Sequence, residues 1–425
     1  MTMIGTGHVD RYLTAGEVGA IVGEAIDALA PDGKRFLFII PDGTRTMPMP
    51  QMASLVRAAL RGRAAAVDFL IALGTHQPMS DAALSAHLGF PVVNGEEAKV
   101  AGGSRVFNHE WHDPAMFRTI GTIPAAEIRA LSQGRLDQDV PVALNRRIFD
   151  YDQIVILGPV FPHEVVGFSG GNKYFFPGIA GADVINFTHW LGALITNYEV
   201  IGSGYTPVRA VVDRAASMVT VPTACFALVV TKDGIGGLYC ADAKSAWEHA
   251  AALSSQRHIV WLERPMRTVI SVMPPMYADV WTAGKGMYKV EPAVADGGEV
   301  IIYAPHITEV SYTHGHLIDA VGYHVRDYFT QQWERFAHIP GGILAHSTHV
   351  KGKGHYDAAT GVETPRIQVT LATGIPEERC RRINLGYLDY RTIDPESWAN
   401  REDEGILLVR RAGEMLYRVA DGDQG

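Results

Sequence analysis

Short apolar runs alternate with amphipathic segments over the first half of the chain. The runs are rich in Val, Ile, Leu and Phe and predict buried strands, while the segments between them have the spacing of helices. Strand, polar loop, helix and strand in that order are typical of a parallel sheet covered on both faces. The predicted strands lie within residues 34–45, 64–76, 150–163 and 225–234, and the predicted helices within 48–62 and 80–89.

The pattern starts again after a connecting helix that is predicted within residues 250–265 and is closed by Pro265. Further strands are predicted at 267–274, 298–305 and 340–350, with a helix within 316–329. This second set of alternating elements predicts a further α/β region.

We therefore predict an α/β protein with two domains. Residues 1–264 would form a larger N-terminal domain with a mainly parallel sheet flanked by helices, and residues 265–399 a smaller α/β domain. The active site is expected in the cleft between them. The tail, 400–425, has the pattern of a strand-turn-strand hairpin and is predicted to pack back on the first domain.

Composition narrows the class of protein. The net charge is −9 and Lys and Arg form no block, which argues against a nucleic-acid or anionic-membrane surface. The three cysteines form no CxxC pair, so a disulfide framework is not expected. The N-terminus lacks the pattern of a secretory signal, and no apolar run reaches the ~18 residues of a membrane span. We expect a cytoplasmic protein.

The segment 160–190 concentrates residues that could carry chemistry. His163 follows a predicted strand, and adjacent glycines in Ser169-Gly170-Gly171 would let backbone N–H groups approach an anion. Lys173 could serve as a point charge or a nucleophile. The alternative is a Gly-rich turn with a solvated lysine.

The loop 108–114 is a second candidate. His109 could be a general base near neutral pH, or could bind zinc together with His112 and an acid. Alternatively, the loop is only polar and is anchored by Trp111.

Other loops add polar groups. Asp42, Thr44 and Arg45 could contact a phosphate or ribose, or could form a simple Asx-turn. The loop 74–78, which contains Gln77, follows the next strand, so several polar loops are expected at one sheet edge. The histidines of 306–355 fit no HExxH or CxxC template, and Lys285 could be a cleft cation or a solvated lysine.

Several motifs together are similar to one known family. They are DGTRTMP at 42–48, LGTHQP at 73–78, NHEWHDP at 108–114, PHEVVGFSGGNKYFFPGIAG at 162–181, THW at 188–190 and the later GKGMY. In this combination the chain resembles the lactate racemase family, whose members use a nickel-pincer nucleotide.

The resemblance implies a role for each matching residue. Lys173 would hold the nickel-pincer nucleotide covalently, and His189 would be the protein ligand of the nickel. His109 and His163 would be the acid–base pair, and Lys285 would bind substrate. The nucleotide would lie near Asp42, Thr44, Arg45, Ser169, Gly170 and Gly171.

The implied activity is racemisation or epimerisation at C2 of a small 2-hydroxy acid. The proton would go to a histidine and the hydride to the cofactor, which avoids a carbanion beside a carboxylate. Gln77 stands where the family carries arginine, so a neutral amide replaces a bidentate carboxylate clamp. The implied substrate is therefore a 2-hydroxy acid, with lactate not singled out and an aldonic acid equally compatible.

Two other classes of function stay open at this point. One is a zinc hydrolase that uses the loop 109–113, and the other is a non-catalytic protein that binds a nucleotide or sugar acid. A nicotinamide dehydrogenase is a weaker third, because no GxGxxG follows the first strand. The expected partners are the substrate and the enzymes that make the cofactor.

Overall fold

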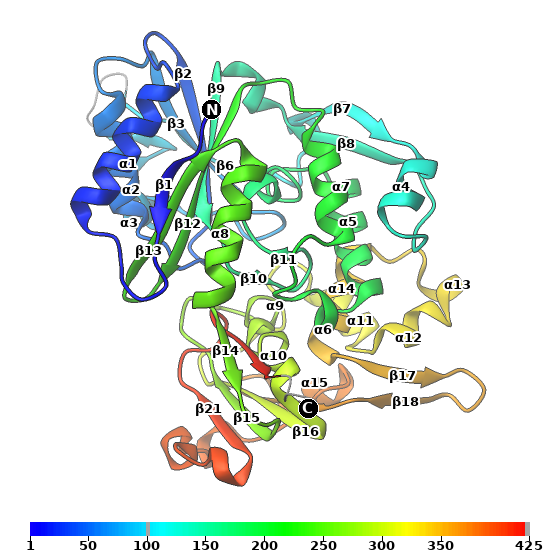
Figure 1. The fold of residues 1–425 in the computed structure, drawn as a ribbon. Helices are drawn as coiled ribbons and strands as arrows, with labels where there is room; N and C mark the ends of the chain where they lie inside the picture. The colour runs from blue at the N-terminus through cyan, green and yellow to red at the C-terminus, as the bar shows by residue number, and fades with distance from the viewer. Residues whose placement is uncertain (99–102, 421–425) are drawn as a thin grey trace, which may run out of the picture. The chain divides into compact units, whose positions relative to one another are not determined.

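The computed structural model describes residues 1–98 and 103–420 (Figure 1). By their internal contacts these residues form two units, each with its own sheet. The first unit comprises Met1–Phe161, Ser169–Ile185 and Arg209–Arg257. The second comprises Pro162–Phe168, Asn186–Val208 and His258–Gly425, the last five residues of which lie outside the described part.

The first unit is built on a seven-stranded sheet with the order β1-β13-β12-β9-β2-β3-β6. The strands from β12 to β6 are parallel, and β13 and β1 extend the sheet with antiparallel pairs. This confirms the predicted α/β class with a mainly parallel sheet. The strands are β1 (Ile4–Gly7), β2 (Arg35–Ile40), β3 (Ala66–Ile71), β6 (Val106–Asn108), β9 (Gln153–Pro159), β12 (Thr223–Thr231) and β13 (Gly234–Ala241).

Helices bury apolar stripes against this sheet. In α1 the buried positions Val18, Ile21, Val22 and Ala25 follow the helical period, and a capping box formed by Thr14 starts the helix. The helices are α1 (Ala15–Ala28), α2 (Met49–Leu60), α3 (Asp81–Leu88), α4 (Ala125–Leu131), α7 (Pro207–Ala216) and α8 (Ala243–Arg257). The short pairs β4 (Val92–Val93) with β5 (Glu96–Glu97) and β7 (Phe117–Ile123) with β8 (Val140–Asn145) complete the unit.

The second unit contains a five-stranded parallel sheet with the order β20-β19-β16-β15-β21. Its strands are β15 (Met266–Val272), β16 (Val294–Ala304), β19 (Gln368–Thr373), β20 (Gly386–Tyr387) and β21 (Ile406–Val409). Smaller pairs are β10 (Pro162–His163) with β11 (Gly167–Phe168), β14 (Ile259–Leu262) with β22 (Leu416–Val419), and β17 (Gly354–Asp357) with β18 (Val362–Pro365).

The helices of the second unit are mostly short. They are α6 (Asn197–Val200), α9 (Val280–Ala283), α10 (Lys285–Tyr288), α11 (Gly315–Val321), α12 (Arg326–Thr330), α13 (Trp333–Phe336), α14 (Gly341–Lys351) and α15 (Glu377–Arg382). The longer α5 (Ala182–Ile195) begins in the first unit and continues into the second. Among residues 1–98 and 103–420, none of the helices has the length and apolarity needed to cross a bilayer.

Three features differ from the predictions. The chain passes between the units several times, whereas continuous domains 1–264 and 265–399 were expected. Residues 341–351 form α14 rather than a strand. Everything from 343 to 351 is buried, and a segment without a polar face does not reveal its period.

The tail also differs from the predicted hairpin. Its strands do not pair with each other, because β21 joins β15 and β22 joins β14. Both contacts lie within the second unit, although the partner of β22, residues 259–262, belongs to the range 1–264 that was expected to form the first domain. All four residues of β21 are buried, which suits a strand in a covered sheet better than a two-stranded hairpin.

Candidate active site

Three polar loops of the first unit follow neighbouring parallel strands. They begin after β2, β3 and β6, which are adjacent in that order. The carboxyl ends of parallel strands meet at one edge of a sheet, where ligands of such folds collect. The prediction that these loops share one edge is confirmed.

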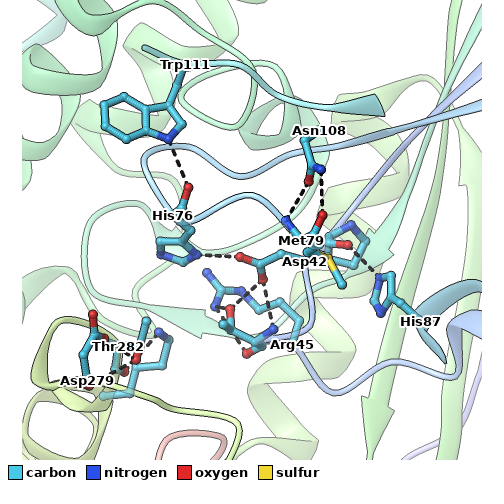
Figure 2. Close-up of polar contacts among 12 residues, drawn as sticks. Asp42, Arg45, His76, Met79, His87, Asn108, Trp111, Asp279 and Thr282 are labelled. Carbon is cyan, nitrogen blue, oxygen red and sulfur yellow. Dashed lines mark hydrogen bonds and ion pairs between the residues drawn. The ribbon is translucent and has the colours of Figure 1, made fainter. Parts of the chain in front are cut away.

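Asp42 organises the loop after β2 (Figure 2). The Oδ1 atom accepts hydrogen bonds from the Thr44 backbone N at 3.0 Å and the Thr44 hydroxyl at 2.6 Å, while Oδ2 lies 2.5 Å from His76 Nδ1. Burial alone would raise the pKa of Asp42, but the neighbouring His76, Arg45 and Thr44 outweigh it and lower that pKa far below its ordinary value. Asp42 is thus an ionised centre that ties two loops together.

Arg45 is held in the same loop. Its guanidinium donates to the Thr44 hydroxyl at 2.8 Å and is stacked 5.7 Å from the ring centre of Phe161. Arginine held in this way is a suitable contact for a phosphate. Gln77, the substituted position of the Gly-Thr-His motif, is exposed in the loop after β3.

Four further hydrogen bonds fix these loops (Figure 2). The amide of Asn108 pairs with both backbone groups of Met79 at 2.9 Å, and Trp111 donates its indole N–H to the His76 carbonyl at 3.0 Å. His87 Nε2 lies 2.9 Å from the Pro41 carbonyl. The loops are therefore set by polar contacts between their own residues. The expectation that Trp111 is an anchor agrees with its bond to the neighbouring loop.

His109 is fully buried directly after β6. Its Nδ1 lies 3.1 Å from Asn145 Nδ2 and its Nε2 lies 3.3 Å from the Ala180 carbonyl, so both ring nitrogens have partners. Burial is the main cause that lowers the pKa of His109 to about 4. A zinc ligand needs a ring nitrogen with a lone pair that points at the metal, and both nitrogens of His109 are engaged in this structure.

The Ser-Gly-Gly turn before Lys173 has a strong structural requirement for its residues. The Ser169 hydroxyl donates to the Pro159 carbonyl and accepts from the Phe161 N, both at 3.1 Å. Gly171 has φ +58°, and a Cβ there would lie 2.9 Å from the Trp247 Cβ. The hydroxyl predicted to contact the cofactor therefore already holds the turn together. Lys173, which follows it, is half-buried.

His163 lies in the second unit and is buried. Its Nδ1 accepts a hydrogen bond from the Val165 N at 3.2 Å and lies 3.3 Å from the Glu164 carboxylate. Glu164 is thus a partner for the protonated ring, whereas His109 has only neutral partners. The two predicted acid–base residues have different surroundings.

Lys285 also lies in the second unit and is only 6% exposed. Its Nζ donates to the Thr282 carbonyl at 3.3 Å and lies 5.1 Å from the centre of the Tyr277 ring. Asp279 caps the preceding turn by accepting from the Thr282 N at 3.0 Å and its hydroxyl at 2.8 Å (Figure 2). Of the two interpretations of Lys285 offered by the sequence, the solvated lysine is therefore wrong.

A group of histidines surrounds Trp281 in the second unit. The ring centres of His346 and His314 lie 4.1 Å and 4.6 Å from that of Trp281. Burial lowers the pKa of His346 well below its ordinary value, helped by neighbours that include Lys285 and His189. His306, His316 and His355 of the same region of the sequence are exposed.

His189 is half-buried on α5. Among residues 1–98 and 103–420, no three His, Cys, Asp or Glu side chains are grouped as they would be around a metal ion. The sequence interpretation missed Asn145, and it gave no role to His346 and His349, which form a buried pair. The three-residue spacing of that pair signals one face of a helix, but only after the segment is known to be helical.

Comparison with known proteins finds similarity to lactate racemases. Residues 19–202 match the model of the lactate racemase N-terminal domain. The lactate racemase of Thermoanaerobacterium thermosaccharolyticum is 25% identical over 283 residues, which are 65% of this chain and 61% of that protein. The lactate racemase of Lactiplantibacillus plantarum is 26% identical over 168 residues, 39% of this chain and 35% of that protein. The matched part thus spans less than two thirds of either racemase.

Solved structures agree over nearly the whole chain. A Thermotoga maritima protein is 31% identical with a TM-score of 0.89, covering 98% of this chain and 100% of that one. The lactate racemase apoprotein of T. thermosaccharolyticum has a TM-score of 0.69 at 19% identity, covering 94% and 92%. The fold is therefore that of the lactate racemase apoprotein. The similarity to the lactate racemase N-terminal domain thus lies in residues 19–202, and the wider chain shares the fold of the apoprotein.

The buried state of His109 predicts a pH dependence of stability. Its folded pKa of about 4 lies below the ordinary value near 6.5, so the unfolded chain takes up the proton first as the pH falls. The free energy of unfolding is therefore unaffected by protonation of His109 above about pH 6.5. Between about pH 6.5 and pH 4 it falls by about 1.4 kcal/mol for each pH unit, because only the unfolded chain binds this proton. In urea unfolding between pH 4.5 and 6.5, His109→Gln should reduce the slope of the unfolding free energy against pH by the equivalent of about one proton. The exposed His112→Gln should not, and equal slopes for both variants would contradict the assignment.

Proposed function

We propose that this protein is a racemase or epimerase that inverts C2 of a small 2-hydroxy acid. The observation that carries the proposal is the match of residues 19–202 to the lactate racemase N-terminal domain, together with the polar loops at one edge of the first unit's sheet. His109, Arg45 and Lys173 all belong to that unit. The zinc hydrolase has less support, because both ring nitrogens of His109 are engaged.

The residues present fit a nickel-pincer nucleotide. Lys173 offers an amine on a turn whose glycines and serine are fixed, Arg45 offers a guanidinium for the phosphate, and His189 offers an imidazole, which suits nickel. When bound, this group would supply the hydride acceptor that no side chain provides. Enzymes that make the cofactor are therefore proposed partners.

The protein's own part in the reaction is to hold and move the hydroxyl proton. We assign His109 and His163 to this task, one for each position of the hydroxyl on C2. Glu164 can stabilise His163 when its ring is protonated, while burial keeps His109 neutral near pH 7. Two titratable groups in such different surroundings suit opposite acid and base roles.

Asn145 sets the tautomer of His109. The Asn145 Oδ1 accepts from the Arg147 N at 3.1 Å, so its NH₂ faces His109 Nδ1 and makes that nitrogen an acceptor. The ring proton then sits on Nε2 and is donated to the Ala180 carbonyl. To act as a base through Nε2, His109 must therefore exchange this bond and move its proton to Nδ1.

The substrate is proposed to be a 2-hydroxy acid with further polar groups. Gln77 replaces the arginine of the family, so the carboxylate would depend more on the buried Lys285. Neutral imidazoles can donate and accept, and the pKa of His346 is lowered by burial and by cations that include Lys285. Such a ring beside Trp281 suits the hydroxyl groups of an aldonic acid better than a methyl group.

The covalent attachment can be tested by mass. Protein co-expressed with the cofactor-making enzymes should carry an adduct on Lys173, seen by intact mass and peptide mapping. Lys173→Ala should abolish the adduct, whereas Lys232→Ala, at an exposed lysine, should keep it. An adduct that persists in Lys173→Ala or maps elsewhere would refute this attachment.

The role of Asn145 can be tested by ¹⁵N NMR of the histidine side chains. The wild-type His109 should be protonated at Nε2. In Asn145→Asp the carboxylate should draw the proton to Nδ1, raise the pKa of His109 and move the acid limb of the pH–rate profile upwards. Asn384 also lies 3.2 Å from a histidine Nδ1, that of His324, but there the Glu363 carboxylate takes the ring N–H at 2.8 Å. Asn384→Asp should therefore leave His109 unchanged and is the control. Unchanged His109 signals in Asn145→Asp would disprove the role.

A further inference from the structure

A small cavity of about 80 Å³ lies within the second unit, separate from all residues assigned above. Two helices end at it: Thr196 directly follows α5, and Gly352 directly follows α14. The carboxyl end of a helix carries partial negative charge and favours cations. The cavity is lined by Ala193, Thr196, Asn197, Tyr198, Glu199, Glu291, Arg326, Thr348, Gly352, Lys353 and Gly354.

Glu291 brings a buried carboxylate to this cavity. It is completely buried, and its oxygens accept from the Lys353 backbone N at 2.7 Å and from Asn197 Nδ2 at 3.0 Å. Both donors are neutral, and among the described residues no cation lies within ion-pair distance of Glu291. Burial therefore raises the pKa of Glu291 despite the more distant Arg366 and Lys353.

Two further oxygens at the cavity have no donor. Asn197 is 3% exposed, and within the part of the chain that the structure describes its Oδ1 has no hydrogen-bond partner. The same holds for Oγ1 of Thr196, whose backbone is in the strained region at φ +93°. Buried acceptors without a partner cost about 1–3 kcal/mol each, and strain of this kind is common at ligand sites.

The cations at the rim are already engaged. Arg326 donates to the Asp327 carboxylate at 2.9 Å and to the Leu194 carbonyl at 3.1 Å. Lys353 is exposed, with its Nζ 3.9 Å from Glu199. The carboxylate of Glu291 and the neutral oxygens of Asn197 and Thr196 are thus the groups that could bind a ligand. Together they carry one negative charge, which a single positive charge would balance.

We propose that this cavity binds one monovalent cation, either potassium or an ammonium group, through Glu291, Asn197 and Thr196. Oxygen ligands suit such hard cations, and the rim cations disfavour a doubly charged ion. The bound cation connects the ends of α5, which carries His189, and α14, which carries His346 and His349. The proposal does not depend on the reaction proposed above.

The first test is thermal stability at constant ionic strength, with choline chloride as the balancing salt. Potassium or methylammonium chloride should raise the Tm by about 2–4 °C for each tenfold increase above the Kd. The two salts distinguish the metal ion from an organic amine. Glu291→Gln and Asn197→Ala should lose this response, while Glu363→Gln, at a carboxylate paired with His324, should keep it. A Tm that is the same in all three salts would overturn the proposal.

The second test needs no variant and therefore does not depend on their folding. Crystals of the wild-type protein grown in rubidium chloride should show an anomalous peak between Asn197, Thr196 and Glu291. Ordered water alone at this position, in crystals that contain 100 mM rubidium or methylammonium, would refute the cation site.

Discussion

The ionised carboxylate of Asp42 is the interaction on which the candidate site of the first unit depends. It lies at the end of β2 and receives hydrogen bonds from its own loop and from His76 of the next loop. Because that carboxylate is buried, its charge is stable only while these partners remain in place. Arg45, and with it the proposed phosphate contact, is positioned through Thr44, which is itself bound to Asp42. Loss of this centre would remove the side-chain link between the loops after β2 and β3.

The protonation of the two predicted acid–base histidines is controlled by different surroundings. His109 is held neutral by burial and by the amide of Asn145, whereas His163 lies beside the Glu164 carboxylate. This difference has a chemical consequence, since a neutral and a chargeable imidazole can exchange a proton in opposite directions near pH 7. The Ser-Gly-Gly turn before Lys173 has a structural role, because the Ser169 hydroxyl bonds the Pro159 carbonyl and Gly171 packs closely against Trp247.

Much of the first unit could be predicted from the sequence. Its strands are continuous apolar runs that end in polar loops, so both the parallel sheet and the shared edge followed from the pattern. The second unit was harder, because α14 is buried on all sides and shows no polar face. Asn145 was missed because a single buried amide has no pattern along the chain. The hairpin predicted for the tail was wrong because β21 and β22 pair with strands of two different sheets. Such pairing depends on contacts between residues far apart in the sequence.

The fate of the hydrogen on C2 of the substrate tests the central claim most directly. The account predicts that this hydrogen leaves and returns as a hydride while only the hydroxyl proton meets a histidine. A 2-hydroxy acid deuterated at C2 and inverted in ordinary water should react with a primary isotope effect and keep its deuterium in both enantiomers. Rapid loss of the deuterium to solvent would show carbanion chemistry and would contradict the account.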